Sequence, residues 1–232
     1  MENQRESKIE KMGECLTRLD NIKQWLEIDT LNKESVSQHS FKVAAFAVTL
    51  MEEVYDGNYA VEVTDLFCQV VTHAIFHDLD EALILRDLSH EVKYNDYNGD
   101  KIRDSVGDYA NYAFFKHFFP EKKQGYKEIS ESDLEHTLYN AVFCTNDVVK
   151  KFVKLCDWLA MGHYVIRELS VGNTNLVNKI VNLDLGLDYA ATELIDALKN
   201  SKVPNLNNFN DFPILNAVDK MRTKLFQFLQ NK

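Results

Sequence analysis

The sequence predicts an all-α fold, and three observations lead to this prediction. The 232 residues include only three prolines and eight glycines, too few for a sandwich or barrel that turns about every ten residues. Apolar residues recur at helical spacing along almost the whole chain. Hydrophobic residues make up 45% of the chain and charged residues 27%, as in globular domains. We expect a helical bundle in a single domain over residues 1–232, with the C-terminal helices at 174–232.

The first expected helix spans residues 14–27, and the second begins near Val36 and ends at Gly57. Between them lies the polar stretch 29–37. Each helix carries apolar residues on one face: Leu16, Leu19, Ile22 and Leu26, with Trp25 beside them, in the first, and Val43, Ala44, Ala47, Val48, Leu50 and Met51 in the second.

Residues 60–77 are the most apolar segment, and their length favours a central helix over a strand. A short helix at 79–86 leads into a polar loop at 87–99. Pro120 with the basic stretch after it, and the Asn-rich segment 204–212, mark further loops. The remaining helices are expected at 101–118, 131–145, 148–169, 174–199 and 213–230, with the last one packing back on the rest.

The charge and the ends of the chain restrict its partners and location. A net charge of -10 argues against binding a nucleic acid polymer, although a metal can still attract a small anionic substrate. The charged N-terminus has no apolar core of a signal peptide, and no apolar run reaches the roughly 20 residues that span a bilayer. We expect a cytoplasmic protein, bacterial or in the host cytosol if phage-encoded. Its four scattered cysteines (Cys15, Cys68, Cys144 and Cys156) are expected to be buried reduced thiols.

The adjacent pair His77-Asp78 ends the most apolar helix. An imidazole beside a carboxylate offers two ligands suited to Mn, Co, Zn, Fe or Mg, and coordination satisfies a buried acid. The alternative is that Asp78 caps the next helix while His77 lies in a solvated turn. His73, one turn earlier, is interpreted as a core or supporting histidine rather than a ligand of a second metal.

Two distant residues strengthen the metal interpretation. His39 opens a helix at the start of its apolar face, and Asp157 lies on an otherwise apolar face beside Val153, Cys156 and Ala160. An inward carboxylate needs a cation or a strong donor, and an ion pair with a lysine is the alternative to a metal. Together the residues form a pattern of one histidine, a His-Asp pair and a distant aspartate.

With these motifs in place, the chain resembles the HD-domain phosphohydrolases, and most closely their bacterial 5′-deoxynucleotidase (YfbR-like) branch. The resemblance covers residues 19–173. The matching pieces are Trp25 fourteen residues before His39, the segment Glu34–Ser40, His77-Asp78, Glu81, Asp87-Leu88, Val92–Tyr94, Lys154–Asp157, Glu168-Leu169 and Gly172-Asn173. It implies one divalent metal bound by His39, His77, Asp78 and Asp157, an HD-type bundle, and a homodimer.

The resemblance also implies roles at the reacting centre. Glu81, expected to move protons, and the ligand Asp78 would be the catalytic residues. Asp87 would bind the sugar hydroxyl, and Trp25 would stack on the sugar and disfavour a 2′-hydroxyl. The alternatives are a solvated Glu81, a loop-capping Asp87 and a Trp25 in the core.

The chain departs from the family pattern around the phosphate. Gln24 stands where the family usually has an arginine, with Lys23 before it, and Gln38 replaces the usual glutamate before the first histidine. One extra residue separates Glu81 from Asp87, and Ser89 replaces a proline. Lys23, Gln24 and Lys93 are the expected substrate-binding residues near the phosphate.

These features predict metal-dependent hydrolysis of a deoxynucleoside monophosphate to deoxynucleoside and phosphate. One alternative is a deoxynucleoside triphosphate triphosphohydrolase that releases tripolyphosphate. A (p)ppGpp hydrolase fits less well because Ala82 follows Glu81 where that class has an aspartate, and a cyclic-dinucleotide phosphodiesterase because the chain has no Gly-Tyr-Pro. The other alternative is a catalytically silent binding module with a structural metal.

Overall fold

The computed structural model describes residues 7–24, 28–57, 60–84, 99–120 and 134–230. Within these ranges the regular elements are helices, together with one isolated antiparallel bridge between Lys23 and Ser35. The helices are α1 (Lys8–Asn21), α2 (Val36–Tyr55), α3 (Val61–Phe76), α4 (Leu79–Ile84), α6 (Gly99–Phe118), α7 (Leu134–Phe143), α8 (Asp147–Ser170), the 3-10 helix η2 (Thr174–Lys179), α9 (Ile180–Lys199) and α10 (Phe212–Gln230). The predicted all-α fold is confirmed.

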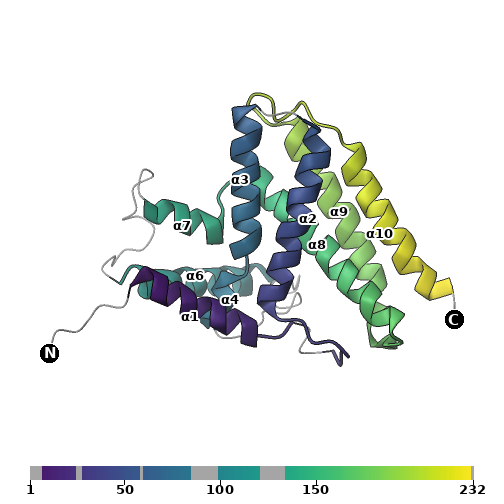
Figure 1. Cartoon of the computed structure of the whole chain (residues 1–232), viewed down its shortest axis with the longest axis horizontal. Coiled ribbons are helices and arrows are strands. Elements are labelled where there is room, and N and C mark those ends of the chain that lie inside the picture. Colours follow the sequence, from purple (N-terminus) through teal and green to yellow (C-terminus); the bar gives the residue numbers. More distant parts are fainter. Residues whose placement is uncertain (1–6, 25–27, 58–59, 85–98, 121–133, 231–232) are drawn as a thin grey trace.

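The larger of two hydrophobic cores lies between α2, α3, α8, α9 and α10. In Figure 1, α8, α9 and α10 run side by side on the right, and α2 and α3 stand beside them. Val43, Phe152 and Leu187 are fully buried there, and each such side chain contributes about 1.5–3 kcal/mol. A side chain at Gly186 would collide with the Trp158 ring, so glycine lets α9 approach α8 closely. As expected, α10 packs back on α2, α8 and α9.

The smaller core is aromatic and lies between α1, α4, α6 and α7. Phe114 is fully buried and contacts the rings of Phe118, Phe119 and Phe143 at centroid distances of 5.2, 5.7 and 5.4 Å. Aromatic pairs at this separation add to the hydrophobic gain of burial. This core holds the short helix α4 in place. Helix α4 follows directly on His77 and Asp78 and lies below the end of α3 (Figure 1).

The first helix lies earlier than predicted. It spans Lys8–Asn21 rather than 14–27, because Ser7 and Glu10 form a reciprocal capping box at its start. At its end the chain turns back: the Gln24 N–H donates to the Glu34 carbonyl at 2.9 Å and the Val36 N–H to the Ile22 carbonyl at 3.0 Å. Backbone groups committed to this bridge cannot continue a helix. Leu16 is therefore exposed, while Leu19 is buried as predicted.

Two smaller expectations need correction. The helix expected from residue 174 begins with the 3-10 turn η2, and α9 starts only at Ile180. All four cysteines are free, as expected, but Cys68 is exposed while the other three are buried. No helix in the described ranges is both long enough and apolar enough to cross a membrane.

Candidate metal centre

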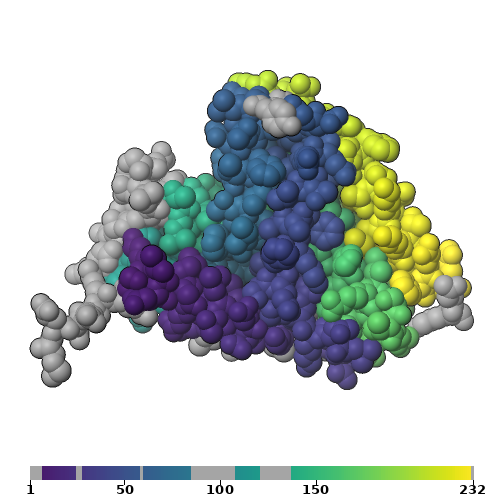
Figure 2. Space-filling model, in the orientation of Figure 1, coloured from purple at the N-terminus to yellow at the C-terminus, as the bar shows by residue number. Residues whose placement is uncertain are grey.

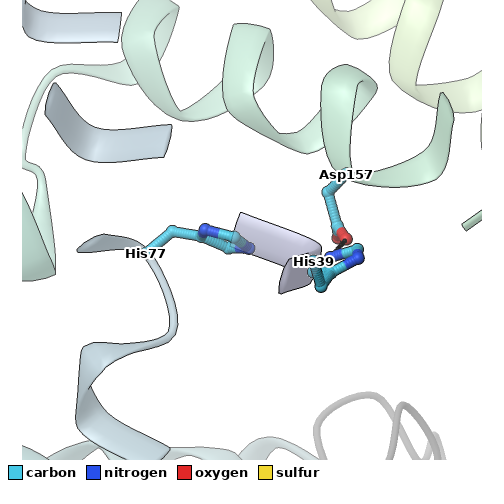
Figure 3. Close-up of side chains that lie close together, drawn as sticks. All are labelled: His39, His77 and Asp157. Carbon is cyan, nitrogen blue, oxygen red and sulfur yellow. Dashed lines mark hydrogen bonds and ion pairs between the residues drawn. The ribbon is translucent and has the colours of Figure 1, made fainter. Parts of the chain in front are cut away.

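Three predicted ligands from three different helices meet at one point. His39 lies in the first turn of α2, His77 follows the last residue of α3, and Asp157 lies in the middle of α8. One ligand atom from each lies within 4.8 Å of the other two. Figure 3 shows the two imidazoles pointing toward one another and the Asp157 carboxylate reaching His39 from α8. The three side chains can together hold a metal ion.

The local sequence explains why these side chains converge. Ser35 caps α2 with Gln38 in a second capping box, which places His39 on the first buried turn, one turn before Val43. On α8, Asp157 lies among Val153, Cys156 and Ala160, which are buried against the larger core. The apolar faces of α2 and α8 therefore carry the ligands inward together.

The hydrogen bonds leave a nitrogen of His77 available for a metal. Its Nδ1–H donates to the Ala74 carbonyl at 2.9 Å, which directs Nε2 toward the group. Asp78 Oδ2 lies 3.0 Å from that Nε2, yet among the described residues this buried nitrogen has no hydrogen bond of suitable geometry. A divalent cation would satisfy it, so the residues present fit a metal.

The charges at the centre are strongly coupled. Burial opposes the charged form of His77, but the carboxylates of Asp78 and Asp157 raise its pKa to about 9. Burial would likewise raise the pKa of Asp157; instead, Lys154 at 2.9 Å and the His39 imidazole at 2.9 Å hold this pKa far below its usual range. The lysine pair considered as an alternative for Asp157 thus exists beside the histidine contact. The site is built to hold anionic carboxylates next to positive charge.

Asp78 and Glu81 are both buried next to this group. Asp78 is 6% exposed and Glu81 is 1% exposed, which rules out a solvated surface position for Glu81. The Glu81 N–H donates to the Asp80 side chain at 3.1 Å and to the Asp78 carbonyl at 3.1 Å. The Asp78 carboxylate contacts His77 but lies outside the set of three mutually close ligands.

Comparison with known proteins identifies the family. Residues 12–206 match the family described as 5′-deoxynucleotidase YfbR-like. The chain belongs to the YfbR-like family. It is 26% identical over 197 residues to a 5′-deoxynucleotidase from Erwinia tasmaniensis, covering 83% of this chain and 90% of that protein. A crystal structure of an HD-domain phosphohydrolase from Listeria innocua superposes with a TM-score of 0.57 at 16% identity, covering 94% of this chain and 98% of the other.

The YfbR-like chain is therefore an HD-domain phosphohydrolase, and the resemblance inferred from the sequence is confirmed. The group of His39, His77 and Asp157 is the candidate metal site among the described residues. The finer assignment of ligands, catalytic residues and substrate remains a proposal.

Only some of the other predicted site residues of this YfbR-like chain lie in the described part of the structure. Trp25, Asp87 and Lys93 lie outside the described residues. The Lys23 Nζ donates to the Asp20 carbonyl at 3.1 Å, and the Gln24 backbone bonds to Glu34.

His73 donates its Nδ1–H to the Ala141 carbonyl at 3.0 Å and lies outside the ligand group. Burial lowers the pKa of His73 to about 4, so its imidazole is neutral at pH 7. The hydrogen bond to Ala141 and the position outside the ligand group agree with a supporting role, whereas a neutral imidazole suits either role.

Two buried acids of the YfbR-like chain, Glu34 and Glu168, belong to the matching pieces of the family pattern, but the sequence reasoning assigned them no role. Glu34, 3% exposed, has Oε1 3.8 Å from His39 Nδ1 and pairs with Lys42. Glu168, fully buried, accepts hydrogen bonds from the Leu31 and Asn32 backbone N–H groups at 2.7 and 3.0 Å and from the Asn173 amide at 2.9 Å. Figure 2 shows the resulting contact between the segment before α2 and the end of α8. Glu168 thus fixes the segment that leads into Glu34 and His39.

Metal binding to the YfbR-like chain should release protons near neutral pH. Because the pKa of His77 is raised to about 9, its imidazole is protonated at pH 7 without metal, and a cation must displace that proton. The affinity for Mn²⁺ should therefore rise as pH rises from 6 toward about 9. Calorimetric titrations in two buffers of different ionisation enthalpy should show release of about one proton at pH 7. Heats that do not depend on the buffer would contradict this.

Proposed function

We propose that this hydrolase converts 5′-deoxynucleoside monophosphates to deoxynucleosides and phosphate, using one divalent metal held by His39, His77, Asp78 and Asp157. The observation that carries the proposal is the convergence of His39, His77 and Asp157 from three helices of an HD-domain fold. The family match and the similarity to the Erwinia tasmaniensis 5′-deoxynucleotidase support the choice of substrate. The mixed nitrogen and oxygen ligand set suits Co, Mn, Zn, Fe or Mg.

When bound, such a metal polarises a phosphate oxygen and makes a bound water more acidic. The chain's own residues supply the rest. Lys154 keeps the Asp157 carboxylate ionised, and Ala74 fixes the His77 tautomer. Glu81, buried one helical turn after His77, is proposed to accept the proton of the attacking water.

A triphosphohydrolase is the second candidate, because Gln24 departs from the family pattern at an expected phosphate partner. The resemblance leads us to expect an arginine at this position, which would pair with a terminal phosphate. Gln24 carries no charge, and its backbone N–H donates to the Glu34 carbonyl. The expected charged partner of the phosphate is therefore missing at this position, and we also consider a substrate with three phosphates.

Incubation with dAMP and with dATP decides between the two functions. The released anion should be identified by ³¹P NMR, with the His77→Ala variant as the inactive control. Orthophosphate from dAMP supports the proposed deoxynucleotidase, and tripolyphosphate from dATP supports the second candidate. Absence of both products with wild-type protein in each of the five metals would contradict an enzymatic role and favour a silent binding module.

Trp25→Ala should relax the discrimination against ribonucleotides. By the family resemblance, we propose that this indole stacks on the sugar and excludes a 2′-hydroxyl. Without it, the ratio of kcat/KM for dAMP over AMP should fall by about tenfold, as expected when about 1.4 kcal/mol of differential binding is lost. Trp158→Phe, a change of the other tryptophan at the contact of α8 with α9, is the control. An unchanged ratio in Trp25→Ala would remove the proposed sugar role.

We also propose the homodimer that the family resemblance implies, and the cytoplasmic location expected from the sequence. The substrate would be a small deoxynucleotide rather than a nucleic acid polymer, in keeping with the net charge of -10.

A further inference from the structure

Glu34 lies buried between a lysine and a proposed metal ligand. Its side chain is 3% exposed, Oε2 pairs with Lys42 Nζ, and Oε1 lies 3.8 Å from Nδ1 of His39. Among the described residues, Oε1 has no hydrogen-bond partner. A buried carboxylate oxygen without a donor is costly, so its place beside an imidazole calls for a functional explanation.

The two nitrogens of His39 face opposite partners. Nε2 lies 2.9 Å from Asp157 Oδ1, on the side of the ligand group, and Nδ1 faces Glu34. A carboxylate behind a ligating imidazole fixes its tautomer with the proton on the outer nitrogen and makes the inner nitrogen a stronger ligand. His77 has a neutral partner in the equivalent position, the Ala74 carbonyl. The two histidines are therefore supported differently.

The backbone around Glu34 holds it in this position. Its carbonyl accepts the Gln24 N–H at 2.9 Å, and the next residue, Ser35, is the cap of α2. Gln38, adjacent to His39 in sequence, is exposed and its side chain accepts the Ser35 N–H at 3.0 Å. Gln38 is thus occupied in the cap and has no charge to offer His39. Glu34 is the buried acid that faces the outer nitrogen.

Lys42 compensates the charge of Glu34 from the solvent side. Both residues line an open hollow of about 720 Å³, together with Asn32, Lys33, Ser37, Gln38, Phe41 and Arg167. The Lys42 side chain is 26% exposed, whereas Glu34 is closed off from solvent. The carboxylate thus has a solvent-side oxygen bound to lysine and an inner oxygen directed at the imidazole.

We propose that Glu34 is a positioning residue that binds the Nδ1–H of His39 and directs its Nε2 to the metal. This inference rests on the proposed metal-dependent function. The 3.8 Å contact would shorten by about 1 Å to a charge-assisted hydrogen bond when a cation draws the imidazole into place. Glu34 contacts neither metal nor substrate in this account and acts only through His39.

Glu34→Gln tests the proposal, since it keeps the shape of the side chain and removes its charge. The affinity for Mn²⁺, measured by calorimetry on the metal-free full chain, should fall by about tenfold or more. In NMR of the protein loaded with diamagnetic Zn²⁺, the His39 Nδ1–H resonance should lose the downfield shift that a carboxylate acceptor gives. The thermal midpoint reports separately whether folding is intact.

Two further variants separate positioning from a structural ion pair. Lys42→Met removes the ion pair but leaves the carboxylate, and should keep wild-type Mn²⁺ affinity. Glu53→Gln changes an exposed glutamate of α2, the helix that carries Lys42, and should also keep wild-type Mn²⁺ affinity. Unchanged Mn²⁺ affinity and an unchanged His39 Nδ1–H resonance in Glu34→Gln, or an equal loss of affinity in Lys42→Met, would overturn the inference. Wild-type protein that binds no Mn²⁺ would instead refute the proposed function itself.

Discussion

Asp157→Ala should abolish both the metal content and the phosphohydrolase activity of this protein. The variant loses the only carboxylate in the group of three converging ligands, and it leaves His39, His77 and the proposed ligand Asp78 to hold a divalent cation. Loss of one ligand should leave the site empty at micromolar concentrations of metal, because metal affinity depends on the number and geometry of the ligands. Elemental analysis after dialysis, together with phosphate release, measures both effects.

Controls must separate metal loss from unfolding. Asp157→Asn keeps the volume of the buried side chain and should lose metal as completely as the alanine variant. Asp147→Asn changes an exposed aspartate of the same helix, 70% exposed, and should keep full metal. Full metal occupancy in a folded Asp157→Ala protein would show that the ligand assignment is wrong.

Glu81→Gln should lower kcat by about 10²- to 10⁴-fold while the metal stays bound. A general base contributes about this factor, and the amide cannot accept a proton. Because Glu81 is 1% exposed, the isosteric glutamine is the gentlest available change. The metal content and KM should stay close to wild type, since Glu81 is proposed to act on water and not as a ligand.

The control for Glu81 is Glu52→Gln, on the exposed face of α2. A pH profile of kcat adds a second readout, because the acidic limb attributed to the base should disappear in Glu81→Gln. Retention of wild-type kcat would remove Glu81 from the reaction. Loss of metal together with activity would instead assign it to the metal site.

The elements that carry the candidate ligands were predictable from the sequence because each has a continuous buried face. The apolar spacing of α2, α3 and α8 predicts helices close to Val36–Tyr55, Val61–Phe76 and Asp147–Ser170. His39 and Asp157 interrupt those faces with polar groups, which marks them as candidates from spacing alone. The family resemblance was needed to join them with His77 into one site.

The start of the chain was less predictable because non-local backbone pairing decides it. Apolar spacing alone continues a helix through residue 27, whereas the bridge between Lys23 and Ser35 ends α1 at Asn21. The partner of that bridge lies beyond a loop, and helical periodicity carries no signal for it. The Ser7 and Glu10 capping box was a readable signal for the true start.

The buried acids Glu168 and Glu34 also differ in how far the sequence could predict their positions. Glu168 lies eleven residues after Asp157, about three helical turns on the same face of α8, so its burial could have been inferred from spacing. Glu34 lies outside α2, and only the folded loop brings it to His39. No periodicity relates the two positions, and a structure was needed to find the contact.

The most direct test of the account is a crystal of the full chain soaked in Mn²⁺ and measured for anomalous scattering. We expect one strong peak bonded to His39, His77 and Asp157, with Asp78 completing the protein ligands. The His39 Nδ1 should then lie within hydrogen-bond distance of Glu34. A peak bound elsewhere, or no peak beside these side chains at millimolar Mn²⁺, would contradict the metal centre on which the proposed hydrolysis depends.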